Sequence, residues 1–441
     1  MPVPLFAAPS AGPAGPACPA CATRLALDER FPTWCPGCEW NLSPAPADAP
    51  VLPPRRRRIS DRRQRADAAL LAAARSRAGQ VYEAVAEGAG ARQDRTWIAA
   101  MAVAALVHLV TGGLLAASVA LQFTGSWPLR AIGWTGLALA VLLRPRFGRV
   151  PKDAGVLGRA AAPTLYALVD RVAAAVGGRP VDVVRVTGEF NASFGRVGLR
   201  RRSVLTLGLS LWEPLTGGQR LALLGHELGH DVNGDHRSSR WLGSAIGTLN
   251  QWWYVSLPDP HAGRTHALEI IAHEIANLFL EIVNRLVGLL LGLLVRLADR
   301  SGQGAEYRAD ALAAEVASTA AAQDMLRVLL LDRTVETFRA RQRSLSGIHR
   351  PGIPRGPAVF WSGLAEELAT VPPQETERLL RLSTRELGSV DSTHPPTHLR
   401  IAMLARRPVL APSVVLTDAE EAAIALELAR HRDRLARELL A

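Results

Sequence analysis

Two histidines four residues apart lie in the segment 221–235, which reads LALLGHELGHDVNGD. On a helix, His226 and His230 are one turn apart on the same face, so both imidazoles can bind one Zn²⁺ at about 2.0 to 2.1 Å. Glu227 lies beside that face, where its carboxylate can reach a metal-activated water without binding the metal. The spacing therefore predicts a site for metal-assisted hydrolysis.

The residues around this motif support the prediction, although HExxH patterns also occur by chance. Leu221–Leu224 can bury the back of the helix, and Gly225 and Gly229 place small residues beside the two histidines. A catalytic zinc also requires a third protein ligand and one open position. Another part of the sequence has to supply that ligand.

Two residues are candidates for the third ligand. His236 lies ten residues after His226, which is the metzincin spacing, but that arrangement also needs a methionine turn under the metal, and the later methionines lie in helix-like runs. Glu306 fits better, because it lies four residues before Asp310 in GAEYRADAL, on an expected second helix. Glu306 can then bind the metal while Asp310 forms a hydrogen bond to a ligand histidine.

All four cysteines lie in the first forty residues, as Cys18-Pro-Ala-Cys21 and Cys35-Pro-Gly-Cys38. Two CxxC pairs separated by thirteen residues can place four thiolates tetrahedrally around a second Zn²⁺. Four protein ligands leave no open position, so this zinc would be structural and would stabilise a segment too small for a core. The alternative is a pair of disulfides in an exported domain.

We expect the N-terminal segment to stay in the cytoplasm. Met1–Ala17 is rich in Pro, Ala and Gly and lacks the basic and apolar regions of an export signal. The arginines after it, at 55–58, 62, 63 and 65, open an alanine-rich connector. Nucleic-acid binding is not expected from the net charge of +11, because Lys152 is the only lysine and the Arg and Ala content looks like a coding bias.

A transmembrane hairpin is expected over residues 96–145. Trp97–Phe123 carries no formally charged side chain and is long enough to cross a bilayer. A second, shorter apolar stretch covers Ala131–Leu143, and arginine clusters flank the pair on both sides. Both ends of the hairpin would therefore face the cytoplasm. A buried soluble hairpin is the alternative.

The remaining sequence predicts a mainly helical domain with a small β-sheet, an α+β fold. Strands are expected at Val181–Val186 and Ser203–Leu207, where β-branched and aliphatic residues are bounded by turns. Two apolar stretches, 241–257 and 278–297, are either further membrane helices or helices that line a cavity. The expected units are the zinc ribbon with a flexible start (1–50), the basic connector (51–95), the hairpin (96–145), the zinc peptidase domain (150–410) and a C-terminal helix (411–441).

The motif HELGH is followed by Asn-Asp spaced around a glycine (Asn-Gly-Asp), and Glu-Tyr-Arg-Ala-Asp begins seventy-six residues after His230. This combination resembles the HtpX and CAAX prenyl protease family of gluzincin metallopeptidases. The resemblance extends from about Gly158 to Arg406. It implies that His226, His230 and Glu306 bind a catalytic zinc, with membrane helices before and after HELGH.

The same resemblance implies roles for three further segments. Residues 191–194 (NASF) partly match the family's Asn-Ala-Phe segment, and Ser203–Gly208 resembles the edge strand before the active-site helix. Residues 394–400 (HPPTHLR) resemble the late His-Pro...Arg motif, so His394, or less favourably Arg400, would contact the oxyanion. The expected substrate-binding residues are Asn191, Val204, Leu205, Thr206 and Leu207.

These patterns together predict a multi-pass zinc metalloendopeptidase of the cell membrane, with its ribbon and catalytic domain facing the cytoplasm. It would bind a catalytic and a structural Zn²⁺, cleave polypeptides, act in membrane protein quality control, and bind a protein partner through the ribbon. Two alternatives remain open. One is a catalytically silent membrane scaffold, and the other is a zinc-ribbon adaptor that binds a protein or nucleic acid through the arginine cluster.

Overall fold

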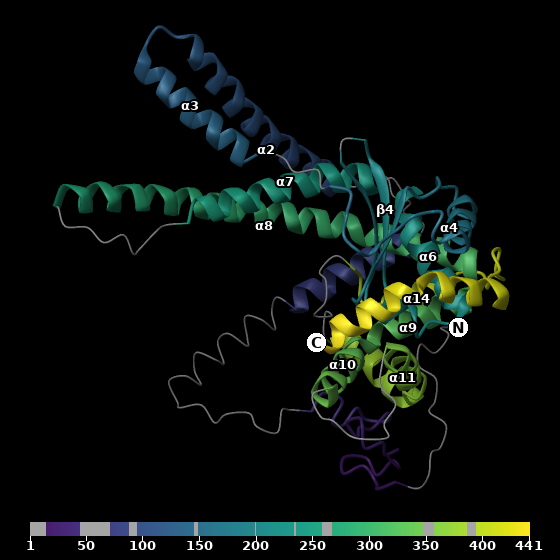
Figure 1. Ribbon diagram of the computed structural model, residues 1–441. Helices are drawn as coiled ribbons and strands as arrows, with labels where there is room; N and C mark the ends of the chain where they lie inside the picture. The colour runs from purple at the N-terminus through teal and green to yellow at the C-terminus, as the bar shows by residue number, and fades with distance from the viewer. Residues whose placement is uncertain are drawn as a thin grey trace.

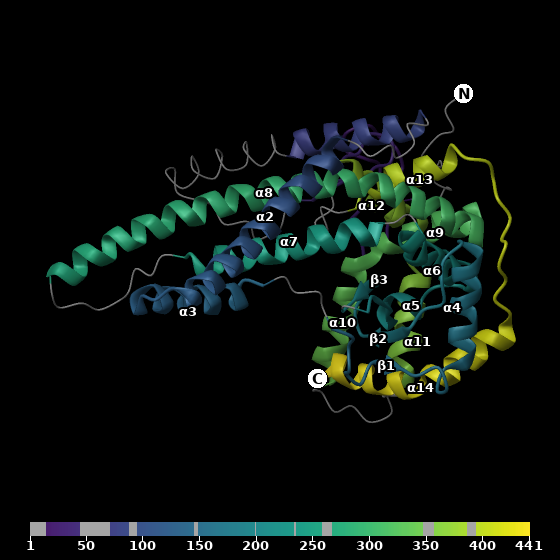
Figure 2. The ribbon, with the colours of Figure 1, turned by 90° about the horizontal axis from the view of Figure 1, so that it is seen from above.

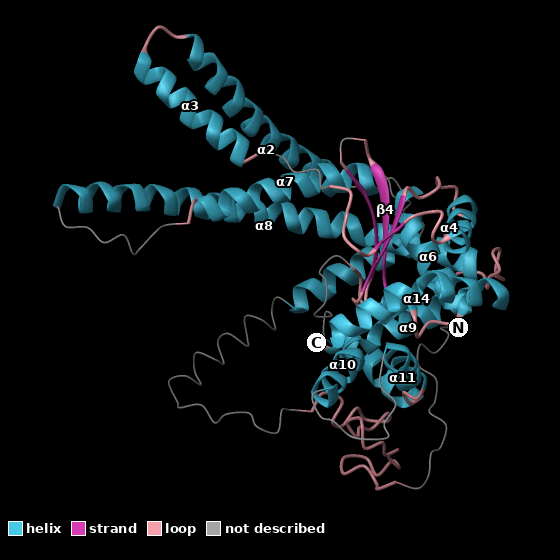
Figure 3. Ribbon diagram, viewed as in Figure 1, coloured by secondary structure: helices cyan, strands magenta, loops and turns pink. Residues whose placement is uncertain are grey.

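The protein is mainly helical with one small sheet, as expected from the sequence (Figures 1 and 3). The computed structural model describes residues 15–44, 71–87, 95–144, 149–198, 200–232, 235–257, 267–346, 357–385 and 394–441. The arginine cluster at 55–65 lies outside these residues.

The sheet has four strands in the order β1-β2-β4-β3. Strands β2 (Val183–Thr187) and β4 (Arg202–Gly208) are parallel, whereas β1 (Val156–Leu157) and β3 (Ala192–Val197) pair antiparallel with their neighbours. The two expected strands are therefore present as β2 and β4. The two strands that the sequence did not predict, β1 and β3, are the outer ones.

The expectation that Ser203–Gly208 is an edge strand is wrong. Residues Val204–Leu207 pair with Val183–Val186 of β2 on one side and with residues 192–195 of β3 on the other. Because β3 folds back onto β4 as a hairpin, the main chain of β4 is enclosed within the sheet. The outermost strand on this side is β3.

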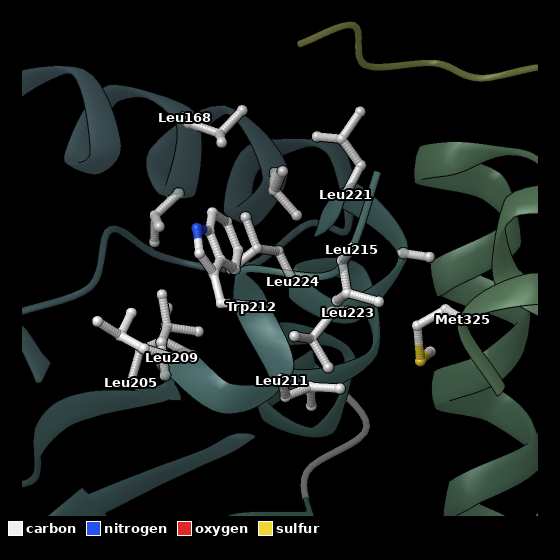
Figure 4. Close-up of a cluster of buried hydrophobic side chains, with 14 of the residues drawn as sticks. Leu168, Leu205, Leu209, Leu211, Trp212, Leu215, Leu221, Leu223, Leu224 and Met325 are labelled. Carbon is white, nitrogen blue, oxygen red and sulfur yellow. The ribbon is translucent and has the colours of Figure 1, made fainter. Parts of the chain in front are cut away.

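The main core lies between the sheet and the helices that cover it. Leu205 of β4, Trp212 and Leu224 are all buried in one cluster, which Met325 also joins (Figure 4). The helices of this domain are α4 (Pro163–Ala175), α5 (Leu209–Trp212), α6 (Gly217–Val232), α9 (Thr319–Val328), α10 (Asp332–Ser346), α11 (Pro357–Ala369), α12 (Pro373–Arg385), α13 (Thr397–Ala405) and α14 (Asp418–Leu440). Two short 3₁₀ helices, η1 (Leu121–Phe123) and η2 (Leu329–Leu331), are also present.

Helix α8 (Ala267–Ala317) is a single helix of 51 residues that joins two parts of the molecule. Its first half lies outside the domain, and its last turns pack against α6 in the core (Figures 1 and 2). The two helices approach closely at two glycines. A Cβ on Gly225 would lie 3.0 Å from Cα of Ala313, and one on Gly229 would lie 3.3 Å from Cα of Ala309. Small residues on both helices therefore bring α8 within reach of the histidine face of α6.

Helices α2 (Arg95–Ala120) and α3 (Trp127–Leu142) form a helical hairpin over the residues where a hairpin was expected. Helix α2 packs against α7 (Asp235–Val255) and the first half of α8, and these helices together project from the domain as an arm whose α2–α3 hairpin diverges from α7 and α8 (Figures 1 and 2). Among the described residues, two helical stretches are long and apolar enough to cross a membrane by length and composition, namely Trp97–Phe123 and His273–Ala317. Helix α3 is shorter than these.

The connector that precedes α2 is helical over residues 71–86 and packs against the domain. The ring of Tyr82 contacts the ring of Tyr307 edge to face, with centroids 6.1 Å apart, and the guanidinium of Arg406 lies over Tyr82. These contacts hold the connector against α8 and α13.

Candidate metal centres

Helix α6 presents His226 and His230 on one face. The Nε2 atoms of the two rings lie 3.3 Å apart, and the rings meet edge to face. The turn before them, Leu221–Leu224, is buried on all sides in the core. The sequence prediction that Leu221–Leu224 bury the helix in the core is therefore confirmed, and burial fixes the direction of both imidazoles.

Helix α8 brings Glu306 to the same point, eighty residues after His226 in the sequence. Its Oε2 lies 3.5 Å from Nε2 of His226, and its Oε1 lies 3.3 Å from Nε2 of His230. All three side chains can place their ligand atoms within 4.8 Å of one another. The structure thus brings together the three residues that the sequence proposed as a ligand set.

These separations fit a zinc ion. Ligands about 2.0 to 2.1 Å from a tetrahedral zinc lie roughly 3.3 to 3.4 Å from each other. Two imidazoles and one carboxylate are also the donor set of many catalytic zinc sites, which keep the fourth position open. The geometry and chemistry of the three side chains therefore match a three-ligand zinc site.

A buried ion pair supports this site from behind. Oδ1 of Asp310 lies 3.0 Å from Nδ1 of His226, which holds the proton on Nδ1 and directs Nε2 toward the other ligands. Arg400 of α13 donates from Nε and Nη2 to the two oxygens of Asp310, at 2.8 and 2.6 Å. Asp310 and Arg400 are both buried, so each neutralises the other in a position that excludes water.

The predicted hydrogen bond between Asp310 and a ligand histidine is therefore present, with the imidazole as donor. Arg400 is engaged with Asp310, and its Nη2 also lies 3.5 Å from Nε2 of His226 and 3.7 Å from Oε2 of Glu306. Burial lowers the pKa of Arg400, but the nearby carboxylates of Asp310, Glu306 and Glu227 outweigh burial and raise the pKa above its usual range. Arg400 stays charged and holds Asp310 in place.

His394 lies just before α13 and contacts Glu306 directly. Its Nδ1 is 2.6 Å from Oε2 of Glu306, and about half of its side chain is exposed. Burial raises the pKa of Glu306, but the hydrogen bond from His394 and the positive charge of Arg400 lower it to about 2. Glu306 is therefore a carboxylate over the physiological range, as a metal ligand must be.

Glu227 is buried on α6 beside the two histidines, on the turn that carries them. Its carboxylate is close enough to Arg400 to raise the pKa of that guanidinium. The position is consistent with a proton acceptor next to the metal ligands. His236, the alternative third ligand, belongs to α7, and its side chain lies outside the described part of the structure.

The model of peptidase family M48 matches residues 160–408, which is more than half of the chain. The chain belongs to peptidase family M48. This confirms the expected resemblance to the HtpX and CAAX prenyl protease type over nearly the same residues, and it makes the chain a member of a metallopeptidase family. Searches among curated proteins and among solved structures found no match. The M48 match leaves out the cysteine segment and the α2–α3 hairpin.

The expected substrate-binding residues lie apart from this constellation of side chains. Val204, Leu205 and Leu207 are buried in the sheet, and the main chain of β4 is enclosed by its neighbours. Asn191 is exposed at the start of β3, where its Oδ1 accepts a hydrogen bond from the amide of Ala192. Position along the sequence placed these residues near α6 correctly but did not reveal the strand order.

A second group of ligand atoms lies in the N-terminal segment. The four cysteine side chains converge, with Sγ atoms 3.6 Å apart for Cys18 and Cys38 and 3.5 Å apart for Cys21 and Cys35. Thiolates around a tetrahedral zinc lie roughly 3.7 to 3.8 Å apart, whereas disulfide sulfurs are bonded at about 2.05 Å. All four thiols are free, which fits a metal site and not the disulfide alternative.

The two cysteine pairs are built as the same turn twice. In both, the amide of the first cysteine donates to the carbonyl five residues later, and the amide four residues later donates back. The residues that close the turns, Ala22 and Glu39, both have a positive φ, of 60° and 58°. Residues other than glycine rarely adopt this backbone conformation. Its repetition indicates that both turns are shaped to aim their thiols at one point.

Proposed function

We propose that this chain is a membrane-anchored zinc metalloendopeptidase, with His226, His230 and Glu306 as zinc ligands and Glu227 as the general base. The observation that carries the proposal is the set of separations of 3.3 to 3.5 Å among the two Nε2 atoms and the carboxylate oxygens of three side chains from two helices. Membership of family M48 supports the reaction class.

The chain's own residues each have a task in this reaction. Zn²⁺ bound at the site supplies Lewis-acid chemistry, since it acidifies a water molecule and polarises a peptide carbonyl. Glu227 accepts the proton of the attacking water and passes it to the leaving amine. His394 is half-exposed beside Glu306, where its ring can donate to the carbonyl oxygen as negative charge develops. Asp310 and Arg400 keep His226 oriented.

The substrate would pair as an extended strand with the outer side of β3. This strand forms the border of the sheet next to α6, and the ion pair between Arg196 and Asp231 fastens it to the end of that helix. Main-chain pairing tolerates many sequences. This favours unfolded polypeptides as the substrate class and is compatible with a role in membrane protein quality control.

The surface of the arm supports membrane anchoring. Large apolar side chains project outward from it, including Leu109 (71% exposed), Phe123 (85%), Trp127 (80%) and Leu289 (72%). Several of its polar groups pair between helices, whereas Arg285 and Glu281 form an exposed ion pair with each other on α8. His108 of α2 contacts Ser244 of α7 at 3.1 Å, and Asn284 of α8 donates to the carbonyl of Trp253 at 2.7 Å. A helix bundle with an apolar exterior and paired polar groups inside suits a lipid environment.

The proposed membrane segments are α2, α3, α7 and residues 278–297 of α8. Residues 305–317 of α8 pack in or beside the domain core and remain outside the bilayer. Each helical pair starts and ends on the domain side of the arm (Figures 1 and 2). The ribbon and the M48 domain would therefore share one side of the membrane, which we propose is the cytoplasmic side on the basis of the flanking arginines.

The peptidase is tested with full-length protein purified in detergent, assayed on casein, alongside the variant Glu227→Gln. Removing the base while keeping all metal ligands should lower kcat by at least about 100-fold, with the bound zinc unchanged. Equal activity of the two proteins, or no activity in either, would reject the proposal. The second outcome with intact zinc content is what a silent membrane scaffold predicts.

The adaptor alternative is tested separately by retention of the same protein on nucleic acid across a salt series. Binding through the arginine cluster would weaken steeply as salt increases. We expect no specific retention, because Lys152 is the only lysine and the high Arg and Ala content looks like a coding bias.

A further inference from the structure

The cysteine segment is attached to the M48 domain through one face of α12. Arg378, Arg381 and Arg385 recur at spacings of three and four residues, so they lie on the same side of this helix. Arg378 donates from Nη1 to the carbonyl of Leu42 at 2.9 Å, and Arg381 donates from Nη1 to the carbonyl of Pro36 at 2.6 Å. Helix α12 lies inside the family match, whereas the cysteine segment that it contacts lies outside it, because the match begins at residue 160.

These contacts involve the second cysteine turn itself. Pro36 lies between Cys35 and Cys38, and Glu39, which follows Cys38, pairs with Arg385. The guanidinium of Arg381 also lies over the ring of Trp34, 5.2 Å from its centroid. Helix α12 therefore binds the part of the segment whose shape the metal would fix.

The centre of the interface is buried, whereas the Arg385–Glu39 pair at its border is partly exposed. Arg378 is buried and forms two hydrogen bonds to buried Glu375, both 2.7 Å long, in addition to its bond to Leu42. Trp34 and Leu42 are buried as well. If the cysteine turn lost its shape, Arg378 would lose a carbonyl acceptor in a position that water does not replace.

Helix α12 also contacts α13, which carries residues of the proposed catalytic centre. Oγ of Ser383, on the last turn of α12, lies 3.1 Å from Nδ1 of His398 on α13. The same α13 segment carries Arg400, which holds Asp310 behind His226, and His394 precedes it and contacts Glu306. A displacement of α12 would therefore move the two side chains that support the catalytic ligands.

We propose that the four-cysteine segment is a metal-dependent clamp: a thiophilic divalent ion, Zn²⁺, shapes its second turn to hold α12, and α12 positions α13 with His394 and Arg400 at the catalytic centre. Arg378 and Arg381 are positioning residues, because neither touches substrate or metal. The proposal rests on the peptidase function for its kinetic readout only. Its structural readouts need no substrate.

The first test uses Cys38→Ser in the full-length protein. Cys38 is exposed, so the change removes a ligand without removing a buried side chain. We expect bound zinc to fall from two ions per chain to one, and amide hydrogen exchange to accelerate in both α12 and α13. With the catalytic zinc retained, kcat should fall about tenfold while KM changes little, since supporting residues around metal ligands typically contribute 10- to 100-fold.

The second test leaves the cysteine site intact. Arg381→Ala should keep both zinc ions yet show the same faster exchange in α13 and the same loss in kcat, and Arg381→Lys should restore part of both. The matched control is Arg171→Ala, because Arg171 also pairs with a carboxylate, Glu420, and a carbonyl, that of Val415, but contacts neither α12 nor the cysteine segment. It should leave α13 exchange and kcat unchanged.

The clamp is overturned if Cys38→Ser loses one zinc while exchange in α13 and kcat stay at wild-type values. It is also overturned if Arg381→Ala behaves like Arg171→Ala. A wild-type protein without peptidase activity would remove the proposed function instead. In that case zinc content and hydrogen exchange, measured without substrate, still decide for or against the clamp.

Discussion

The two proposed metal centres of this chain are built in opposite ways. The four cysteines lie within 21 residues, and two copies of one short turn supply all four ligand atoms. The catalytic centre joins two histidines of α6 to Glu306 of α8, and its geometry depends on helix packing and on a buried ion pair behind His226. One centre is closed by four protein ligands, whereas the other has three and can admit water.

The difference determines what each centre depends on. A local site requires its own turns and its metal, so a change elsewhere in the chain should leave it intact. A site assembled across helices requires the core that holds the helices together, and it should fail when that core is disturbed. The following predictions test this distinction.

The largest effect is expected when Glu306 is replaced by Ala. The two histidines alone cannot hold a catalytic zinc firmly, so activity should fall by at least about 1,000-fold and bound zinc should drop from two ions to one. Metal analysis and casein cleavage on the same sample measure both. The remaining zinc should resist substitution of His226 but disappear with Cys18→Ser; loss of both ions from the Glu306 variant would contradict the independence of the centres.

Replacing Arg400 by Ala should reduce the free energy of unfolding of the M48 domain by about 3 to 5 kcal/mol. The cause is that Asp310 would be left charged and unpaired in the core. Denaturant unfolding in detergent measures the change. A double variant with Asp310→Asn should recover part of the stability, and a loss no larger than that of an exposed pair such as Arg327 with Asp324 would argue against this account.

Replacing Gly225 by Val should separate α6 from α8. A Cβ added at this position would lie 3.0 Å from Cα of Ala313, which is a backbone atom and cannot move aside as the end of a side chain can. Overpacking of this kind costs about 1 to 3 kcal/mol, and it should also weaken the catalytic zinc while sparing the cysteine zinc. Gly243→Val on α7 is the control, because a Cβ there meets nothing within 4 Å. Thermal unfolding and zinc titration with a chelator report both effects.

The smallest effect is a pH dependence of the contact between α12 and α13. Burial lowers the pKa of His398 from 6.5 to about 4, and the hydrogen bond with Ser383 only partly offsets this. Between these values the unfolded chain binds a proton that the folded chain does not, so stability should fall as the pH drops from about 6.5 to about 4.

We expect a loss on the order of 1 kcal/mol from this residue between pH 7 and pH 5, after allowing for partial exposure. The measurement is the difference in unfolding midpoint between wild type and His398→Gln at both pH values. An identical pH dependence in the two proteins would show that His398 is not the group responsible.

Much of the architecture was predictable because it depends on local patterns. Periodic apolar residues predicted α6, the two cysteine pairs predicted a pair of metal-binding turns, and an uninterrupted apolar stretch predicted α2. Strand order was not predictable, since the pairing of β4 with both β2 and β3 depends on contacts between distant segments. The same holds for α8, which the sequence divided into an apolar stretch and a separate ligand helix because its character changes near residue 298.

The sequence by itself determined which side chains could hold metal, because HExxH and CxxC fix ligand spacing within one helical turn or one tight turn. It also named Glu306 and Asp310, since a pair of carboxylates four residues apart shares a helix face. Only the tertiary structure decided that Arg400 pairs with Asp310, that β3 borders the sheet, and that α12 contacts the cysteine segment. These contacts join residues that are tens to hundreds of positions apart, and the packing of the core alone brings them together.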